Sequence, residues 1–200
     1  MIQTIFGSPV IILKVENVEE VFSKKTYEKT VEHLMLLENK FIDHPYTRGG
    51  KICTTDIGSE TRVDTVGVDL LADFLKKTAL SYAYLYSDKP IKDLKFCYYW
   101  VNLSFQGCEI TNHTDQNSNT DRRLIVTFYP KVPSGSANLV FIHNSKGGEW
   151  VSECSEKDLV RVVVEEGSIV IFDNQILHAV DVHQVEDSRM CIATEFVIVN

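Results

Sequence analysis

His113 and Asp115 are the residues of this chain whose types and spacing point most directly to chemistry. The triplet His113-Thr114-Asp115 lies between two runs of strand character, within CEITNHTDQNSNTDRRLIVTFYP. Residues two apart in an extended chain point to the same side, so one strand end can aim an imidazole and a carboxylate at one ion. Two histidines and one carboxylate on one face of an octahedral Fe(II) leave the opposite positions open. The triplet therefore predicts two of the three protein ligands of an iron site.

His178 is the expected third ligand. It follows the turn Asp173-Asn174-Gln175, where the chain leaves one strand and enters the next, so its side chain can face a cavity. Arg189 opens the last strand, and we expect it beside the His178 strand with its guanidinium in the same cavity. A guanidinium can bind a carboxylate through two parallel hydrogen bonds. Arg189 therefore suits the distal carboxylate of a dicarboxylate cosubstrate.

Other side chains of the expected strands can complete this cavity. Tyr129 can donate a phenolic hydrogen bond to the same carboxylate. Cys191 and Ala193 share the face of Arg189 and are small enough to leave room. Trp100 and Asn102 share one face of an earlier strand. We expect Trp100 to pack, whereas Asn102 either contacts cosubstrate or substrate or makes a structural hydrogen bond.

Each of these residues alone has a simpler explanation. An isolated His-x-Asp is common in solvated loops and Asx turns, and an arginine at a strand start is usually a surface charge. Arg122 and Arg123 precede a strand near the expected cavity mouth, where one could meet a substrate carboxyl or carbonyl, or both could be solvated. The order of the motifs favours a site, because the joint pattern is much rarer than its parts.

The elements ahead of these strands are expected to be mainly helical. Residues 9–15 form a short apolar run, which predicts a strand. A capping-box-like start at Asn17 and apolar residues at helical spacing predict a helix over 17–40. Residues 43–61 are rich in glycine and polar residues, which predicts irregular structure and a mobile lid over the site. A second helix is expected over 65–85.

From residue 95 onward the apolar pattern changes to a period of two. Strands are expected at 96–105, 109–113, 124–129, 138–143, 160–164, 168–172, 178–182 and 190–199. Those at 160–164 and 168–172 are expected to form a hairpin. The order predicts a mainly β protein with N-terminal helices, an antiparallel double-stranded β-helix of the cupin-like jelly-roll type. We expect one domain, with 1–94 as helical support and 95–200 as jelly-roll core.

Composition excludes several classes of protein. A formal net charge of −8 with scattered basic residues disfavours nucleic acid as a partner. No apolar run is long enough to span a bilayer, and no secretory signal is recognised, so a cytoplasmic protein is expected. The five cysteines have no CxxC spacing, which argues against a disulfide framework and a zinc knuckle.

The segment 97–197, about half of the chain, resembles the catalytic core of the Fe(II)- and 2-oxoglutarate-dependent dioxygenases. That family carries His-x-Asp, a distant His, and an Arg roughly ten residues beyond it. The tripeptide WVN before the His-x-Asp and the run EEGSIVIFDNQILHAV after it are similar to the bacterial and phage branch of prolyl-hydroxylase-like oxygenases. This chain differs from that branch in two ways. Cys191 stands where a Ser or Thr hydroxyl is usual, and Leu103 with Asn102 where prolyl hydroxylases commonly carry a Tyr.

The resemblance implies a chemistry and a set of ligands. His113, Asp115 and His178 would bind Fe(II), while Arg189 and Tyr129 would bind 2-oxoglutarate. With O2 as second cosubstrate, such an enzyme hydroxylates an unactivated C–H bond and releases succinate and CO2.

The expected substrate is a prolyl residue in a peptide or protein, for which an extended groove is required. A free amino acid, which needs a closed pocket with paired charges, another small molecule or an alkylated base are alternatives. A metal-binding jelly roll without turnover is a further alternative from outside the enzymes.

Overall fold

The computed structural model describes residues 1–37, 47–54, 68–115, 123–143 and 155–200. The α-helices of this part are α1 (Val18–Val21), α2 (Lys24–Leu37) and α3 (Val68–Leu80). The strands are β1 (Ile2–Ile5), β2 (Ser8–Lys14), β3 (Thr47–Gly49), β4 (Ile52–Thr54), β5 (Asp93–Ser104), β6 (Cys108–His113), β7 (Arg123–Lys131), β8 (Leu139–Ile142), β9 (Leu159–Val162), β10 (Ser168–Asp173), β11 (His178–Val180) and β12 (Arg189–Val199). Among the described helices none has both the length and the apolar character needed to cross a membrane.

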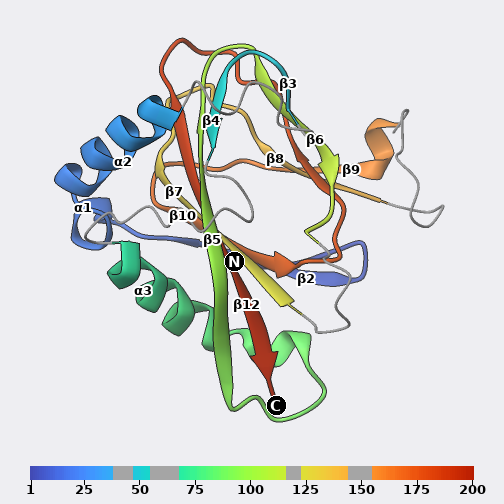
Figure 1. Ribbon diagram of the computed structural model, residues 1–200. Coiled ribbons are helices and arrows are strands. Elements are labelled where there is room, and N and C mark those ends of the chain that lie inside the picture. Colours follow the sequence, from blue (N-terminus) through green and yellow to red (C-terminus); the bar gives the residue numbers. More distant parts are fainter. Residues whose placement is uncertain (38–46, 55–67, 116–122, 144–154) are drawn as a thin grey trace.

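The strands form two antiparallel sheets (Figure 1). One has seven strands in the order β1-β2-β10-β7-β12-β5-β4, and the other has five in the order β3-β6-β11-β8-β9. Every one of the eight strands expected after residue 95 is present. The prediction of a mainly β jelly roll with N-terminal helices is therefore confirmed.

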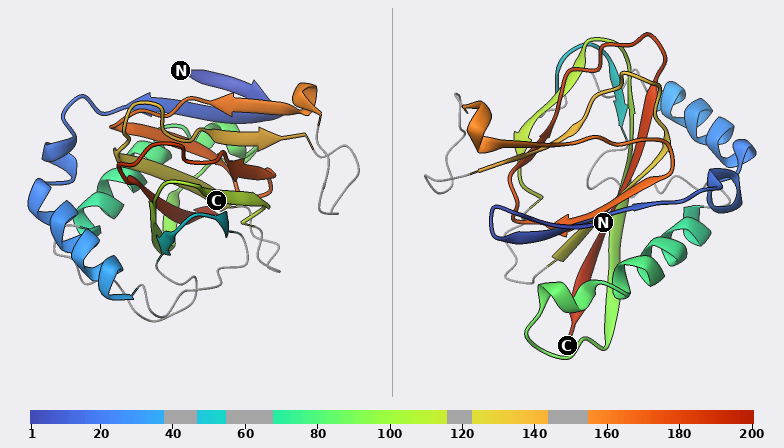
Figure 2. Two further views of the ribbon diagram at one scale, coloured as in Figure 1. Left: turned by 90° about the horizontal axis from the view of Figure 1, so that it is seen from above. Right: turned by 180° about the vertical axis from the view of Figure 1, so that it is seen from behind.

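The seven-stranded sheet has an apolar core on each of its faces. Along β10 the alternating side chains Ile169 and Ile171 pack toward the helices, whereas Val170 and Phe172 pack into the space between the sheets. Figure 2 shows α1, α2 and α3 following one another along one side of the molecule. The helices therefore cover the outer face of the larger sheet and leave the interior between the sheets to the β-strand side chains.

The single helix expected over 17–40 is interrupted. Helix α1 ends at Val21, and α2 begins at Lys24 with the Ser23 hydroxyl accepting a hydrogen bond from the Thr26 backbone N–H at 3.2 Å. Between the two, Phe22 is buried and meets Phe128 of β7 edge to face, with ring centroids 6.4 Å apart. A serine able to cap a new helix and the burial of Phe22 explain the break. Residues 38–40 lie outside the described part.

The segment 43–61 was expected to be irregular, and for its described part that prediction is wrong. Strand β3 pairs with β6 of the smaller sheet, and β4 pairs with β5 of the larger one. Residues 47–54 are therefore built into both sheets, which also contradicts a lid that moves over this length. The rest of the expected lid, 43–46 and 55–61, lies outside the described residues.

Gly50, in the β3–β4 connection, packs directly against backbone. A Cβ at this position would lie 2.2 Å from the Gln106 carbonyl oxygen and 2.6 Å from the Cys108 nitrogen. Because backbone atoms cannot turn aside as a side chain can, Gly50→Ala should lower the free energy of unfolding by roughly 1–3 kcal/mol or more. Gly7→Ala is the control: it has φ +84° but no neighbour within 4 Å, so only about 1 kcal/mol of backbone strain is expected. Urea unfolding would compare them, and equal losses would contradict the packing argument.

The hairpin expected over 160–173 is not formed. Strand β9 pairs with β8 in the smaller sheet, whereas β10 pairs with β2 and β7 in the larger one. The Glu165-Glu166-Gly167 turn therefore carries the chain from one sheet to the other. Gly167 has φ +84°, and a Cβ there would lie 2.3 Å from the Val15 carbonyl oxygen. Glycine is thus required at this crossing.

Candidate metal centre

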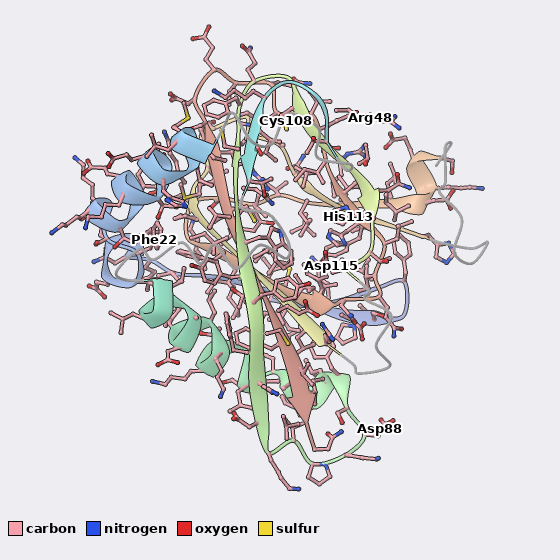
Figure 3. All side chains as sticks on the ribbon, viewed as in Figure 1. Phe22, Arg48, Asp88, Cys108, His113 and Asp115 are labelled. Carbon is pink, nitrogen blue, oxygen red and sulfur yellow. The ribbon has the colours of Figure 1, made fainter. Side chains whose placement is uncertain are left out.

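His113, Asp115 and His178 come together between the sheets, as the sequence predicts. Strand β11 pairs with β6 so that His178 lies opposite His113, and Asp115 follows just after β6. The ligand atoms of the three side chains all lie within 4.8 Å of one another, and the described residues offer no other such group. His178 Nε2 is 3.5 Å from Asp115 Oδ2, and His113 Nε2 is 3.8 Å from Asp115 Oδ1. In Figure 3 His113 and Asp115 lie at the end of β6, across the molecule from Phe22.

Backbone carbonyl groups orient both imidazoles. His113 Nδ1 donates to the Thr111 carbonyl oxygen at 2.8 Å, and His178 Nδ1 donates to the Ile176 carbonyl oxygen at 3.0 Å. With the proton held on Nδ1, the lone pair of each ring is on Nε2, the atom that faces Asp115. Phe172 meets the His178 ring edge to face at 5.0 Å and limits its rotation. The rings are therefore arranged as metal ligands.

Burial sets the protonation of this cluster. It lowers the pKa of His178 to about 4, so this ring is neutral at pH 7 and keeps its lone pair. Burial raises the pKa of Asp115, whose Oδ2 accepts no hydrogen bond from any described residue. A divalent cation would supply the missing partner and hold the carboxylate ionised. Two imidazole nitrogens and one carboxylate suit iron(II) and similar first-row metals.

Arg189 reaches the interior from the opposite sheet. The expectation that its strand lies beside that of His178 is wrong: β12 pairs with β5 and β7, whereas β11 pairs with β6 and β8. The side chain is 1% exposed, and its Cζ lies 4.8 Å from the ring centroid of Tyr129. Its Nε and Nη2 have no hydrogen-bond partner among the described residues. The guanidinium is thus buried with donors to spare.

Tyr129 and Cys191 lie next to Arg189 in the interior. Burial raises the pKa of the Tyr129 phenol above its usual value and raises the pKa of the Cys191 thiol to about 11. Both groups are therefore protonated at neutral pH and can act as hydrogen-bond donors. Their position beside the guanidinium is compatible with the carboxylate site that the sequence predicts, and that site stays a prediction.

The remaining predicted site residues fall into different places. Trp100 packs in the core between the sheets, as expected. Asn102 lies opposite Cys191 in the sheet, and its Oδ1 accepts a hydrogen bond from the Thr54 hydroxyl at 2.6 Å. That bond gives Asn102 a structural role, and a contact with cosubstrate stays a prediction. Arg122 lies outside the described residues.

Glu195 is an interior residue that the sequence prediction did not include. It is fully buried on β12, and its Oε1 accepts a hydrogen bond from Arg123 Nη1 at 2.5 Å. A signal was available in the strand RMCIATEFVIV. Alternation places residue 195 on the same face as residues 189, 191 and 193, so the only acidic residue of this strand had to point inward.

No protein-family model and no curated protein sequence matches this chain, whereas solved structures match its fold. AviO1 from Streptomyces viridochromogenes Tue57 has a TM-score of 0.65 and 13% identity, over 94% of this chain and 89% of that one. An oxidoreductase of the 2OG-Fe(II) oxygenase family from Burkholderia pseudomallei has a TM-score of 0.59 and 13% identity, over 94% and 85%. A prolyl-4-hydroxylase from Pseudomonas putida has a TM-score of 0.56 and 11% identity, over 96% and 92%.

At sequence identities of 11–13% the similarity to these solved structures shows the fold alone. The chain has the jelly-roll fold of 2OG-Fe(II) oxygenases, including a prolyl-4-hydroxylase, over nearly its whole length. The resemblance expected from the motifs is confirmed at this level, and the structural match extends beyond the half of the chain that carries them.

Proposed function

We propose that this protein is an Fe(II)- and 2-oxoglutarate-dependent dioxygenase that hydroxylates an unactivated C–H bond. One observation carries the proposal: Arg189 is 1% exposed, and two of its guanidinium nitrogens have no partner in the described part of the chain. A buried cation without a counterion costs several kcal/mol. An anionic ligand would offset that cost. A metal-binding jelly roll without turnover would need the three ligands but not this arginine.

The metal would be held by His113, Asp115 and His178, whose donor set fits Fe(II). Bound iron, with 2-oxoglutarate and O2, supplies the oxidising power that breaks the C–H bond, and the protein supplies position and shielding. Arg189 would hold the distal carboxylate of 2-oxoglutarate by charge-assisted hydrogen bonds. Tyr129 would donate a hydrogen bond from its phenolic hydroxyl to the same carboxylate. The aromatic side chains packed around the interior would exclude water from the reacting centre.

For the substrate we propose a prolyl residue in a peptide or protein. The support is the likeness to the Pseudomonas putida prolyl-4-hydroxylase, together with the sequence motifs on both sides of the His-x-Asp. Incubation of proline-containing peptides with Fe(II), 2-oxoglutarate and O2 should add one oxygen atom to a peptide and form an equal amount of succinate. If peptides remain unchanged while another compound gives succinate, the oxygenase stands and the prolyl assignment is wrong.

We also propose that the protein works inside the cell. Among the described cysteines, four are free and three of these are buried. Reducing compartments keep thiols in this state.

The first test needs no substrate. Anaerobic addition of Fe(II) and 2-oxoglutarate to the purified protein should give the weak visible charge-transfer band of the iron chelate. Fe(II) alone or 2-oxoglutarate alone should give no band. Bound iron without a band at saturating 2-oxoglutarate would overturn the cosubstrate assignment.

Cys191→Ser is expected to strengthen cosubstrate binding. The protonated thiol is a weak donor, and a hydroxyl at the same position can give a stronger hydrogen bond to a carboxylate held by Arg189. One added hydrogen bond of ordinary strength corresponds to a decrease of roughly 3- to 10-fold in the Kd of 2-oxoglutarate. Titration of the charge-transfer band measures this Kd. Cys108→Ser, at another buried thiol, is the control, and an unchanged or higher Kd for Cys191→Ser would contradict the prediction.

A further inference from the structure

Arg123 and Glu195 form a buried ion pair that the proposed chemistry of iron and cosubstrate does not use. Arg123 opens β7 with 8% of its surface exposed, and Glu195 on β12 is fully buried. Arg123 Nη1 and Glu195 Oε1 lie 2.5 Å apart. Taking two charges out of water is expensive, and replacing such a pair by apolar residues is often neutral or stabilising. The pair therefore calls for a reason beyond stability.

The pair lies in the same interior as the metal ligands. In the sheet Glu195 is opposite Ile125, whose side chain belongs to the core between the sheets. Cys191 and Ala193, on the same face of β12 as Glu195, belong to that core as well. Two backbone hydrogen bonds through Asn174 also connect Arg123 with Asp115: Asn174 N–H donates to the Arg123 carbonyl oxygen, and Asp115 N–H donates to that of Asn174, each at 3.1 Å.

The inner face of β12 carries a charged residue toward each of its two ends. Arg189 stands at one end of this face and Glu195 six residues later, which corresponds to roughly 20 Å along an extended strand. The Phe172 ring meets that of His178, Phe172 lies opposite Ile125, and Ile125 lies opposite Glu195, so the candidate metal ligands lie near this part of β12. If the cosubstrate extends from the metal toward Arg189, the polar groups at the Glu195 end are left for the substrate.

The polar atoms at this second end define what could bind there. Glu195 Oε2 is buried and accepts no hydrogen bond from the described residues. Arg123 has five N–H donors, of which this pair uses one, and its side chain is 10% exposed. An acceptor of negative charge thus lies beside donors of positive charge, with no net charge for the pair. The complementary group is neutral overall and has an N–H donor beside a carbonyl or carboxylate acceptor.

We propose that Glu195 and Arg123 bind the main-chain nitrogen and oxygen of an amino-acid unit in the substrate, with Glu195 Oε2 accepting the N–H and Arg123 donating to the oxygen. This inference rests on the proposed oxygenase function and deepens it. A free amino acid offers an ammonium and a carboxylate, and a residue within a peptide offers an amide N–H and a carbonyl. Both present the same N–H donor and oxygen acceptor. An uncharged sugar or alcohol offers only hydroxyl groups, which carry smaller partial charges.

The test measures binding, with activity left aside. Protein loaded anaerobically with Fe(II) and 2-oxoglutarate is titrated with free amino acids, with the corresponding N-acetyl amino acid amides, and with sugars. Isothermal calorimetry and the shift of the charge-transfer band are the readouts. Glu195→Gln keeps the size of the side chain but lets an amide replace the free acceptor. Loss of a hydrogen bond to a carboxylate should weaken binding of the amino-acid unit roughly 10- to 100-fold.

Controls separate this inference from protein folding and from the proposed function. Glu156→Gln removes a carboxylate that pairs with Arg161 on the surface, at 2.7 Å and 80% exposed, and should leave binding unchanged. If Glu195→Gln alone unfolds, the double variant Arg123→Met with Glu195→Leu keeps an apolar core, and it should lose the binding while retaining the band. Both interior variants should keep the Kd of 2-oxoglutarate, because that ligand is assigned to the opposite end.

Each outcome decides the matter. Tighter binding of free amino acids than of acetylated amides would identify the free form as the source, and the reverse would identify a peptide. Equal affinities of wild type and Glu195→Gln, binding of sugars alone, or no binding of any amino-acid unit to wild type would overturn the inference while the band upholds the oxygenase. Absence of the band from wild type would instead refute the proposed function.

Discussion

His178→Ala is expected to abolish the charge-transfer band and to weaken Fe(II) binding by more than roughly 100-fold. The reason is that the described residues bring together three candidate ligands and no fourth that could replace a lost one. Changes to groups that merely orient a ligand already cost 10- to 100-fold in metal affinity, so loss of a ligand itself should cost more. The measurement is a titration of metal-free protein with Fe(II) under anaerobic conditions.

His143→Ala is the matched control for this variant. His143 is exposed and stacks on Phe6, with ring centroids 4.9 Å apart, and it belongs to no candidate metal group. It should bind iron as wild type does. Retention of the iron affinity and of the band by His178→Ala would show that the metal is held elsewhere, and circular dichroism would exclude a folding defect as the cause of a loss.

Arg189→Met is expected to raise the Kd of 2-oxoglutarate by more than roughly 100-fold while leaving Fe(II) binding intact. Breaking a buried ion pair by removing one partner costs about 3–5 kcal/mol, and each 1.4 kcal/mol is a factor of ten in affinity. The same variant should not destabilise the metal-free protein and should raise its melting temperature, because it removes a buried cation of which two nitrogens have no partner among the described residues. Higher stability together with weaker cosubstrate binding is the signature of a residue kept for a ligand.

Arg161→Met serves as the control for Arg189→Met. Arg161 forms its ion pairs on the surface, with Glu156 and Asp181, so its loss should change neither the Kd of 2-oxoglutarate nor the stability by more than about 1 kcal/mol. A normal Kd for Arg189→Met would remove the main support for the cosubstrate. A large drop in its melting temperature would show that the guanidinium has partners beyond those described.

The sequence predicted the strands and the grouping of the three candidate metal ligands well, because both depend on local patterns. Alternation along 96–105 and 168–172 was enough to locate β5 and β10, and the His-x-Asp spacing was enough to place two ligands on one strand end. His178 could be added because a turn and a strand start restrict where a side chain points. The physical information lies within a few residues in each of these cases.

The partners of strands could not be predicted in the same way. Alternation tells which residues share a face but not which sheet a strand joins, so the Glu165-Glu166-Gly167 turn was mistaken for a hairpin although it crosses between sheets. The same gap put Arg189 next to the His178 strand instead of opposite it. Strands β3 and β4, which join different sheets, were missed because three-residue strands are too short to show a period. Glu195 and Arg123 are 72 residues apart in the sequence, so no local pattern predicts that they pair.

The distribution of the candidate ligand-binding residues over the two sheets has a consequence for the rigidity of the protein. The candidate metal ligands His113 and His178 belong to the smaller sheet, with Asp115 just after its strand β6, and Arg189 belongs to the larger sheet. Iron by itself would thus connect side chains of the smaller sheet, whereas a molecule bound to both iron and Arg189 would cross-link the two sheets. Such a ligand would add a polar link to the apolar core that already joins the two sheets, so the ligand-bound protein is expected to be the more rigid form.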